Sequence, residues 1–390
     1  MSEVGDVLEL AVDTVAHGGW CVARHDGMVV FVRHALPGER VRARVTDRRK
    51  AFLRADCVEV LAASPDRVEP PCAYARRCGG CDWQHVTPAE QRALKAAVVE
   101  EQLRRLAGVE LPVEVEEVPG APDGLGWRTR VTFGVDHMGH AGFLAHRSHD
   151  VVPVDRCVIA HPAVEALGVE GRSWPGVRQV EVAASATSGE SVVRPTPGPA
   201  PRDLVHEQAA GRTWQVTGTG FWQVHPGASD VLVDAVLAAL DPRDGESALD
   251  LYAGVGLFAG ALAARLGPGG RVTAVESGRA AVRDARANLA DVPTVTVRAG
   301  DVEQVLRRLR LRRADLVVLD PPRRGAGRAV VDLLARIETR RVAYVACDPA
   351  ALARDVRYYQ DRGWRLTGLR AFDLFPMTHH VECVALLEPS

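Results

Sequence analysis

The sequence lacks the features that mark secreted, membrane-spanning or repetitive proteins. Its first residues, MSEVGDVLELAVD, are acidic and contain no apolar core like that of a signal peptide. No uninterrupted apolar run approaches the length of a transmembrane helix, and the chain has no internal repeat or low-complexity tract. We therefore expect a cytoplasmic protein without a membrane partner.

An excess of charge of one sign is also missing. The 390 residues carry 48 Lys and Arg against 50 Asp and Glu, a net charge of −2. The basic residues are nonetheless concentrated, because residues 33–54 hold eight Lys or Arg against two acids and residues 307–313 hold five Arg and no acid. Such patches on a near-neutral chain suit a polyanionic partner, although a solvated charged face explains either patch alone equally well.

Cysteine, in contrast, is well represented, with eight residues in the chain. In the cytoplasm such thiols are reduced, metal-binding or catalytic rather than disulfide-bonded. Cys72, Cys78 and Cys81 form the motif C-x5-C-G-G-C. Three thiolates need a fourth ligand to hold a zinc ion or an iron–sulfur cluster, and the uneven spacing is not the doubled CxxC of a zinc ribbon.

The pattern of apolar residues divides the chain into three regions. Residues 1–61 alternate apolar and polar positions in short runs, which predicts a small OB-like β-barrel. Residues 62–218 open with a Pro-rich linker, continue with a helix over 88–107 and return to β-strands. From 219 to 390 strands alternate with helices, which is typical of an α/β domain with a doubly wound parallel sheet. We expect the helix over 88–107 to pack on this last domain.

The first strands of the third region predict a cofactor site. In LDLYAGVGLFAGALAARL the strand ends near Tyr252, and Gly254 and Gly256 let the backbone approach a ligand at the following helix. The second strand ends in Glu276, a carboxylate that can accept hydrogen bonds from both hydroxyls of a ribose. The third ends in Asp301, within reach of an adenine amino group. These features in order predict a cofactor that contains a nucleoside.

The fourth strand ends LVVLDPPRRG and argues against NAD, which the glycines alone would allow. Asp320 followed by two prolines makes a stiff strand end with few backbone donors, suited to a planar substrate. The next strand ends YVACDPAALARD, which places Cys347 at a strand-to-helix corner, where α/β proteins carry their chemistry. A buried cysteine is otherwise a small hydrophobe.

Together these motifs resemble those of the S-adenosylmethionine-dependent RNA uracil-5-methyltransferases. DLYAGVG, LDPPRRG, YVACDPAALARD and DLFPMTHHVE occur in that order and spacing, after FWQVHPGASDVL. The barrel (a TRAM domain) and the cysteine motif are similar to the branch that modifies 23S ribosomal RNA. The resemblance covers essentially the whole chain and implies a class I methyltransferase domain that makes 5-methyluridine in a structured RNA.

The resemblance also implies roles for individual residues. Cys347 is the nucleophile and Glu382 the proton acceptor. Cys157 joins the three motif cysteines as the fourth ligand of a [4Fe-4S] cluster. The residues that contact S-adenosyl-L-methionine are Gln223, Tyr252, Gly254, Gly256, Glu276, Asp301 and Asp320.

The chemistry requires these residue types. C5 of uracil is too weakly nucleophilic to take a methyl group from a sulfonium, and addition of a thiolate to C6 makes C5 electron-rich. After methyl transfer a base must remove the hydrogen on C5 so that the cysteine can leave. Because C5 is out of reach inside a base stack, we expect a flipped uridine, with Phe221 as a stacking partner unless it belongs to the core.

Three positions depart from the family pattern. Leu257 stands where an Asn is usual, His225 replaces the Asn of the F-x-Q-V-N motif, and Asp348 replaces the Asn after the nucleophile. A carboxylate beside Cys347 opposes thiolate formation unless it is paired or turned away.

We expect a monomer whose partner is RNA rather than DNA. The barrel and cysteine motif favour 23S ribosomal RNA over the T-loop of transfer RNA. A protein of another class, a non-catalytic RNA-binding protein on the same scaffold, is the alternative.

Overall fold

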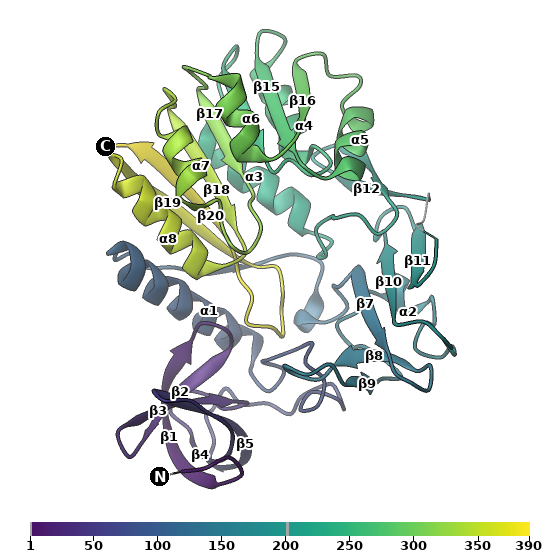
Figure 1. Ribbon diagram of the computed structural model, residues 1–390, viewed down its shortest axis with the longest axis vertical. Coiled ribbons are helices and arrows are strands. Elements are labelled where there is room, and N and C mark those ends of the chain that lie inside the picture. The colour runs from purple at the N-terminus through teal and green to yellow at the C-terminus, as the bar shows by residue number, and fades with distance from the viewer. Residues whose placement is uncertain (1, 200–202) are drawn as a thin grey trace.

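The computed structural model describes residues 2–199 and 203–390 (Figure 1). A barrel at the N-terminus is followed by a central β-region and by an α/β sheet that ends at the C-terminus. Within these ranges no helix is both long and apolar enough to cross a bilayer.

Five strands close the N-terminal barrel in the order β1-β2-β3-β5-β4. Along β1, Leu8, Leu10 and Val12 are buried and their neighbours are exposed, the two-residue period of a strand with one face in a core. The barrel predicted for residues 1–61 is confirmed. Its strands are β1 (Val7–Ala16), β2 (Trp20–His25), β3 (Met28–Arg33), β4 (Arg40–Arg48) and β5 (Phe52–Ala62).

The central region is built on a five-stranded sheet in the order β11-β10-β7-β8-β9. The cysteine motif lies in an irregular segment beside it, joined by the hydrogen bond from Gly79 N to Leu144 O (2.9 Å). The elements are β7 (Arg130–Val135), β8 (Ala141–Leu144), β9 (Val151–Pro153), α2 (Pro162–Glu165), β10 (Gln179–Ala184) and β11 (Ser191–Thr196), with the short 3₁₀ turn η2 (Pro122–Gly124) before them.

Eight strands form the C-terminal sheet, in the order β16-β15-β14-β17-β18-β20-β19-β6. Strands β14 to β18 run parallel, whereas β20 is antiparallel to β18 and β19. All four residues of β17 are buried, as expected for a parallel strand covered on both faces. The strands are β6 (Val115–Glu117), β14 (Ser247–Leu251), β15 (Arg271–Glu276), β16 (Val295–Ala299), β17 (Leu316–Leu319), β18 (Arg341–Ala346), β19 (Trp364–Asp373) and β20 (Glu382–Pro389).

Helices cover both faces of this sheet. One apolar core lies between the sheet and α3 and α4, and a second lies between the sheet and α6, α7 and α8. The predicted α/β architecture with helices on both faces of the sheet is thus confirmed. Its helices are α3 (Ala228–Leu240), α4 (Leu257–Leu266), α5 (Arg279–Asn288), α6 (Val302–Leu309), α7 (Gly327–Leu334) and α8 (Pro349–Gln360).

Segments from before residue 219 complete this domain. Strand β6 pairs with β19 at the sheet edge. The hairpin of β12 (Leu204–Ala209) and β13 (Arg212–Thr217) buries Trp214 in the core beside α3 and α4. Helix α1 (Pro88–Gln102), continued by the π-helix η1 (Leu103–Ala107), packs on α8, and its buried Lys95 lies 2.5 Å from Asp373. The C-terminal α/β domain therefore includes residues far from it in the sequence.

Candidate active site

Three strand ends meet at one edge of the C-terminal sheet. Asp320 follows β17, Cys347 follows β18, and Glu382 begins β20. Strand β18 lies between the other two, with Leu319 paired to Tyr344 and Ala346 paired to Cys383. This register brings a thiol and two carboxylates together at the carboxyl ends of the parallel strands, where α/β proteins bind ligands.

Cys347 sits at the corner between β18 and α8, as the sequence predicts. Pro349 occupies the first turn of α8, and Asp348 caps the helix by accepting a hydrogen bond from Ala351 N (2.8 Å). Burial raises the pKa of the Cys347 thiol to about 12, to which Glu382 and Asp320 contribute, while Arg323 lowers it. The thiol is therefore protonated in the absence of ligands.

Arg323 is a cation that acts on this site. Besides opposing the rise in the pKa of Cys347, it lies 3.3 Å from His380 Nε2. Arg354 is engaged elsewhere, since it pairs with Asp355 (2.8 Å) and donates to the Arg324 carbonyl (2.7 Å).

The two carboxylates form a coupled pair. Burial raises the pKa of Glu382 well above its ordinary value, and Asp320 adds to this rise. Desolvation also raises the pKa of Asp320 to about 7. Because a charge on one of these carboxyl groups disfavours ionisation of the other, one of them keeps a proton at neutral pH. Such a pair can take up and return a proton during a reaction.

The glycine turn after β14 has the backbone geometry expected of a cofactor loop. Gly254 and Gly256 have positive φ angles of 55° and 95°, and Tyr252 between β14 and this turn also has φ of 65°. A Cβ on Gly256 would lie 2.6 Å from Leu289 Cδ1, so the end of α5, where Leu289 lies, approaches the turn closely.

The acids at the next two strand ends bind backbone amides at this edge. Glu276 accepts hydrogen bonds from Gly254 N (2.9 Å) and Gly278 N (2.6 Å), which fixes its carboxylate beside the turn. Asp301 caps α6 by accepting from Gln304 N (3.1 Å). Gln223 is half-buried in the loop before α3, and in residues 2–199 and 203–390 no hydrogen bond joins it to these groups.

Asp250 is a further candidate residue of this site, which the sequence motifs did not single out. It is fully buried in β14, its Oδ2 accepts from Ala259 N (2.8 Å), and its Oδ1 has no partner among the described residues. Burial raises its pKa to about 7. A single acid in the apolar run SALDL, just before a glycine turn, is the signal that could have revealed it.

The departures from the family pattern have structural explanations. Leu257 is buried at the start of α4, in the core. His225 is buried, accepts a hydrogen bond from Gly227 N at Nδ1 (3.2 Å) and stacks on Trp127. Phe221 is 69% exposed, so it does not belong to the core.

Asp348, the third departure, is paired. Its Oδ2 lies 3.3 Å from Nε2 of His17, at the tip of the β1–β2 hairpin of the barrel. The same hairpin meets the segment before Glu382, because a Cβ on Gly19 would lie 2.9 Å from His379 Cβ. No sequence motif pointed to these contacts, which join the two ends of the chain.

The four cysteines of the proposed cluster line one pocket in the central region. Burial raises the pKa of Cys157 to about 11, with a smaller contribution from Cys78. Gly80 N donates to Cys78 Sγ (3.3 Å). In the described ranges no three His, Cys, Asp or Glu side chains could hold a metal ion as they stand. Four cysteine thiols are the donor set that iron–sulfur clusters use.

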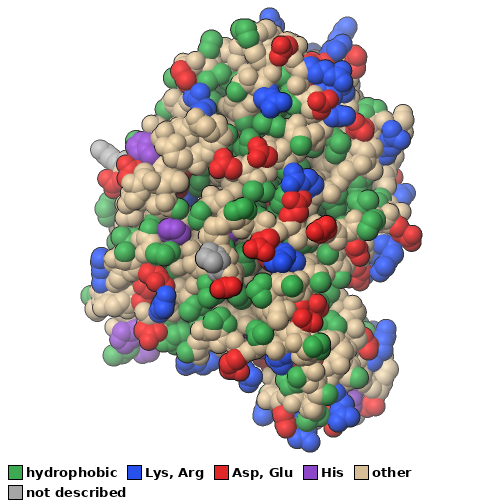
Figure 2. All heavy atoms as spheres, turned by 180° about the vertical axis from the view of Figure 1, so that it is seen from behind, with side chains coloured by type: hydrophobic (Ala, Val, Ile, Leu, Met, Phe, Trp, Pro, Cys, Tyr) green, Lys and Arg blue, Asp and Glu red, His purple; other side chains and the backbone are tan. Residues whose placement is uncertain are grey.

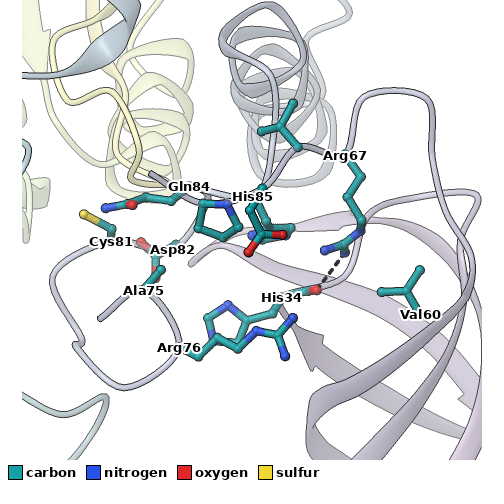
Figure 3. Close-up of a pocket in the computed structure, with 12 residues that line it drawn as sticks. His34, Val60, Arg67, Ala75, Arg76, Cys81, Asp82, Gln84 and His85 are labelled. Atoms are coloured by element: carbon teal, nitrogen blue, oxygen red, sulfur yellow. Dashed lines mark hydrogen bonds between the residues drawn. The ribbon is translucent and has the colours of Figure 1, made fainter. Parts of the chain in front are cut away.

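A second cavity, of about 380 Å³, lies between this segment and the barrel (Figure 3). Arg67 donates to the His34 carbonyl (2.8 Å) across it, and His34 and His85 lie on its wall. Burial lowers the pKa of His34 to about 3 and that of His85 to about 4, so both imidazoles are neutral.

The basic stretch of the barrel is largely neutralised by acids. Arg40, Arg42, Arg48, Arg49 and Arg54 each form an ion pair with an acid of the barrel or its N-terminus. Figure 2 shows the barrel as a separate lobe with basic and acidic side chains interspersed. Arg44 and Lys50 are exposed and have no ion pair within the described ranges.

Comparisons with known proteins agree with this architecture. Residues 211–390 match the family described as tRNA (Uracil-5-)-methyltransferase, and residues 1–58 match the TRAM domain. An uncharacterised RNA methyltransferase of Streptomyces avermitilis is 50% identical over 99% of each chain. Another, from Corynebacterium efficiens, is 36% identical over 98% of this chain and 94% of its own.

A solved structure shows the same fold. The Pyrococcus abyssi tRNA (uracil-54, C5)-methyltransferase, crystallised in complex with S-adenosyl-L-homocysteine, superposes with a TM-score of 0.73. The match covers 97% of this chain and 99% of that one, at 24% identity.

Proposed function

The chain belongs to the RNA methyltransferase family, with a TRAM domain and a uracil-5-methyltransferase domain, and we propose that it methylates C5 of a uridine in structured RNA. The observation that carries this proposal is the meeting of Cys347, Glu382 and Asp320 on neighbouring strand ends. The glycine turn with Glu276 and Asp301 lies on the same sheet edge.

The methyl donor is S-adenosyl-L-methionine. In this proposal Glu276 binds the ribose, Asp301 binds the adenine, and Tyr252, Gly254 and Gly256 form the turn beside them, which the hydrogen bond from Gly254 N to Glu276 and the positive φ angles of the turn support. Asp320 and the loop residue Gln223 complete the set of contacts. The donor supplies the methyl group and, on its sulfonium, a positive charge that offsets the carboxylates around Cys347.

The protein's residues then act in sequence. Cys347 loses its proton through the carboxylate pair to solvent, which leaves Glu382 free to act as a base later, and its sulfur adds to C6 of the flipped uracil, which makes C5 a nucleophile. C5 takes the methyl group from the donor's sulfonium, so that the S–CH3 bond breaks and S-adenosyl-L-homocysteine is left. Glu382 removes the remaining hydrogen from C5, the C5–C6 double bond re-forms, and the bond between Cys347 and C6 breaks. Exposed Phe221 is available to stack on a base.

Cys72, Cys78, Cys81 and Cys157 hold a [4Fe-4S] cluster in this proposal. Their shared pocket and the backbone N–H donated to Cys78 support it. Because the methyl transfer needs no electron, the role we propose for the cluster is to stabilise the fold of the central region. Protein purified without oxygen should be brown and contain iron; colourless, zinc-loaded protein would refute the cluster.

The RNA we favour is 23S ribosomal RNA, on the strength of the barrel and the cysteine motif. The T-loop of transfer RNA is the second candidate, because the matched family and the solved structure are both named for transfer RNA. Incubation with radiolabelled S-adenosyl-L-methionine and each RNA, followed by mapping of the methyl group, tests both. Absence of 5-methyluridine from every RNA would instead support the non-catalytic alternative.

A further inference from the structure

The hairpin between β1 and β2 lies against the strand end that carries Cys347. At its tip, His17 Nε2 is 3.3 Å from an oxygen of Asp348, the residue directly after Cys347. The side chains are 39% and 27% exposed, so the pair is only partly screened by water.

Backbone contacts fix this hairpin in place. The Gly19 carbonyl accepts a hydrogen bond from the buried Trp83 Nε1 (3.2 Å). Gly19 has a positive φ of 81°, and any side chain there would collide with His379. The segment that contains His379 runs from β19 down toward the barrel and leads into Glu382 (Figure 1). The hairpin thus touches the segments that present both the thiol and the base.

Each oxygen of Asp348 has a partner. Oδ1 accepts from Ala351 N at the start of α8, and Oδ2 faces His17. Burial would raise the pKa of Asp348, but the hydrogen bonds from His17 and the helix lower it overall. Asp348 is therefore ionised, and its charge adds to the rise in the pKa of Cys347.

His17 is protonated over a wider pH range than a free histidine. Two acids face it, Asp348 and Glu101 on α1, and the hydrogen bond to Asp348 is the main cause of its raised pKa. An imidazolium here cancels the charge of the one carboxylate that replaces a neutral residue beside the nucleophile.

We propose that His17 is a positioning residue for Cys347: it holds the Asp348 carboxylate against the hairpin and neutralises it, so that the barrel completes the active site. This inference rests on the proposed role of Cys347 as nucleophile. It also gives the barrel a role at the active site, since a displaced hairpin leaves an unpaired carboxylate beside the sulfur.

The test compares His17→Asn, Asp348→Asn and the double variant. Asn caps a helix as well as Asp does, so Asp348→Asn removes the charge and keeps the helix start. The first measurement is the rate at which iodoacetamide alkylates Cys347, followed by mass spectrometry of its peptide. His25→Asn is the matched control, because His25 pairs with Asp26 (3.5 Å) at another turn of the same barrel.

We expect His17→Asn to slow alkylation about three- to tenfold at neutral pH, since each unit of thiol pKa changes the thiolate fraction tenfold. In the Asp348→Asn background, His17→Asn should leave the alkylation rate of Cys347 unchanged. His25→Asn should leave that rate unchanged in both the wild-type and the Asp348→Asn backgrounds. The wild-type and His17→Asn rates should converge as the pH rises through the raised pKa of His17.

An unchanged alkylation rate in His17→Asn would overturn the proposal. It would also be overturned if His17→Asn slowed alkylation equally with and without the Asp348 charge, because His17 would then act through packing alone. Methylation kinetics provide the second readout, where His17→Asn should lower kcat with little change in KM for RNA. Full methylation by Cys347→Ala would refute the proposed function instead, while the alkylation rates of the other variants would still report on His17.

Discussion

Replacement of Glu382 by Gln should change two rates in opposite directions. Glu382 is buried beside Cys347, and Gln has nearly the same shape but accepts no proton. Loss of the base should leave methylated uracil attached to Cys347, because the hydrogen on C5 is no longer removed. Loss of the negative charge that Glu382 carries at alkaline pH should at the same time make the Cys347 thiol more acidic.

The structure gives the size of each effect. A positioned general base contributes about 10²- to 10⁴-fold, so turnover should fall by that range. After burial, Glu382 is the largest contributor to the rise of the Cys347 pKa to about 12. If its removal lowers that pKa by about half to one unit, alkylation at alkaline pH should accelerate about three- to tenfold.

Methylation of RNA is measured with labelled donor, and the adduct is detected as protein that co-migrates with RNA under denaturing conditions. Alkylation of Cys347 is followed in the same preparations across pH. Asp320→Asn is the matched control for the charge effect, since it also removes a neighbouring carboxylate. Turnover at the wild-type rate, or slower alkylation in Glu382→Gln, would refute the assignment of Glu382 as the base.

Three further predictions concern the scaffold. Lys95→Met should lower the unfolding free energy by about 3–5 kcal/mol, measured by denaturant titration, because it leaves the buried Asp373 unpaired. The double variant Lys95→Met/Asp373→Leu should recover most of this loss. A double variant that loses as much stability as the two single variants together would contradict the prediction. Asp250→Asn should stabilise the protein at pH 8 by at most about 4 kcal/mol and have little effect near pH 4. The pKa of Asp250 is about 7 in the folded protein and 3.8 in the unfolded chain, so the wild-type protein loses stability as the pH rises from 3.8 to 7. Equal stability of variant and wild type at pH 8 would contradict a buried charge at Asp250. Gly256→Val should abolish binding of S-adenosyl-L-methionine in calorimetry through its collision with Leu289, whereas Gly245→Val, at an open turn, should bind normally.

The positions of the candidate active-site residues could be predicted from sequence because each follows or begins a strand. Asp320, Cys347 and Glu382 lie within short motifs whose strand–turn–helix pattern is local, and parallel strands bring their ends to one edge. Asp250 was not predicted as a site residue, because a single acid in an apolar strand interrupts the apolar pattern and its burial is known only from the structure.

Contacts between distant segments could not be predicted in this way. The pairing of β6 with β19 and the ion pair of Lys95 with Asp373 depend on how whole regions dock. The same holds for His17 and Asp348: the sequence indicated that a carboxylate beside the nucleophile needs a partner, but nothing local identified a histidine of the barrel.

Covalent capture tests the central role of Cys347 most directly. The protein is incubated with S-adenosyl-L-methionine and RNA that contains 5-fluorouridine, whose C5 fluorine cannot be removed as a proton. After nuclease digestion, mass spectrometry should find the modified, methylated nucleotide on the peptide that contains Cys347, and Cys347→Ala should give neither adduct nor methylated RNA. Methylation of normal RNA by Cys347→Ala at the wild-type rate would contradict the account.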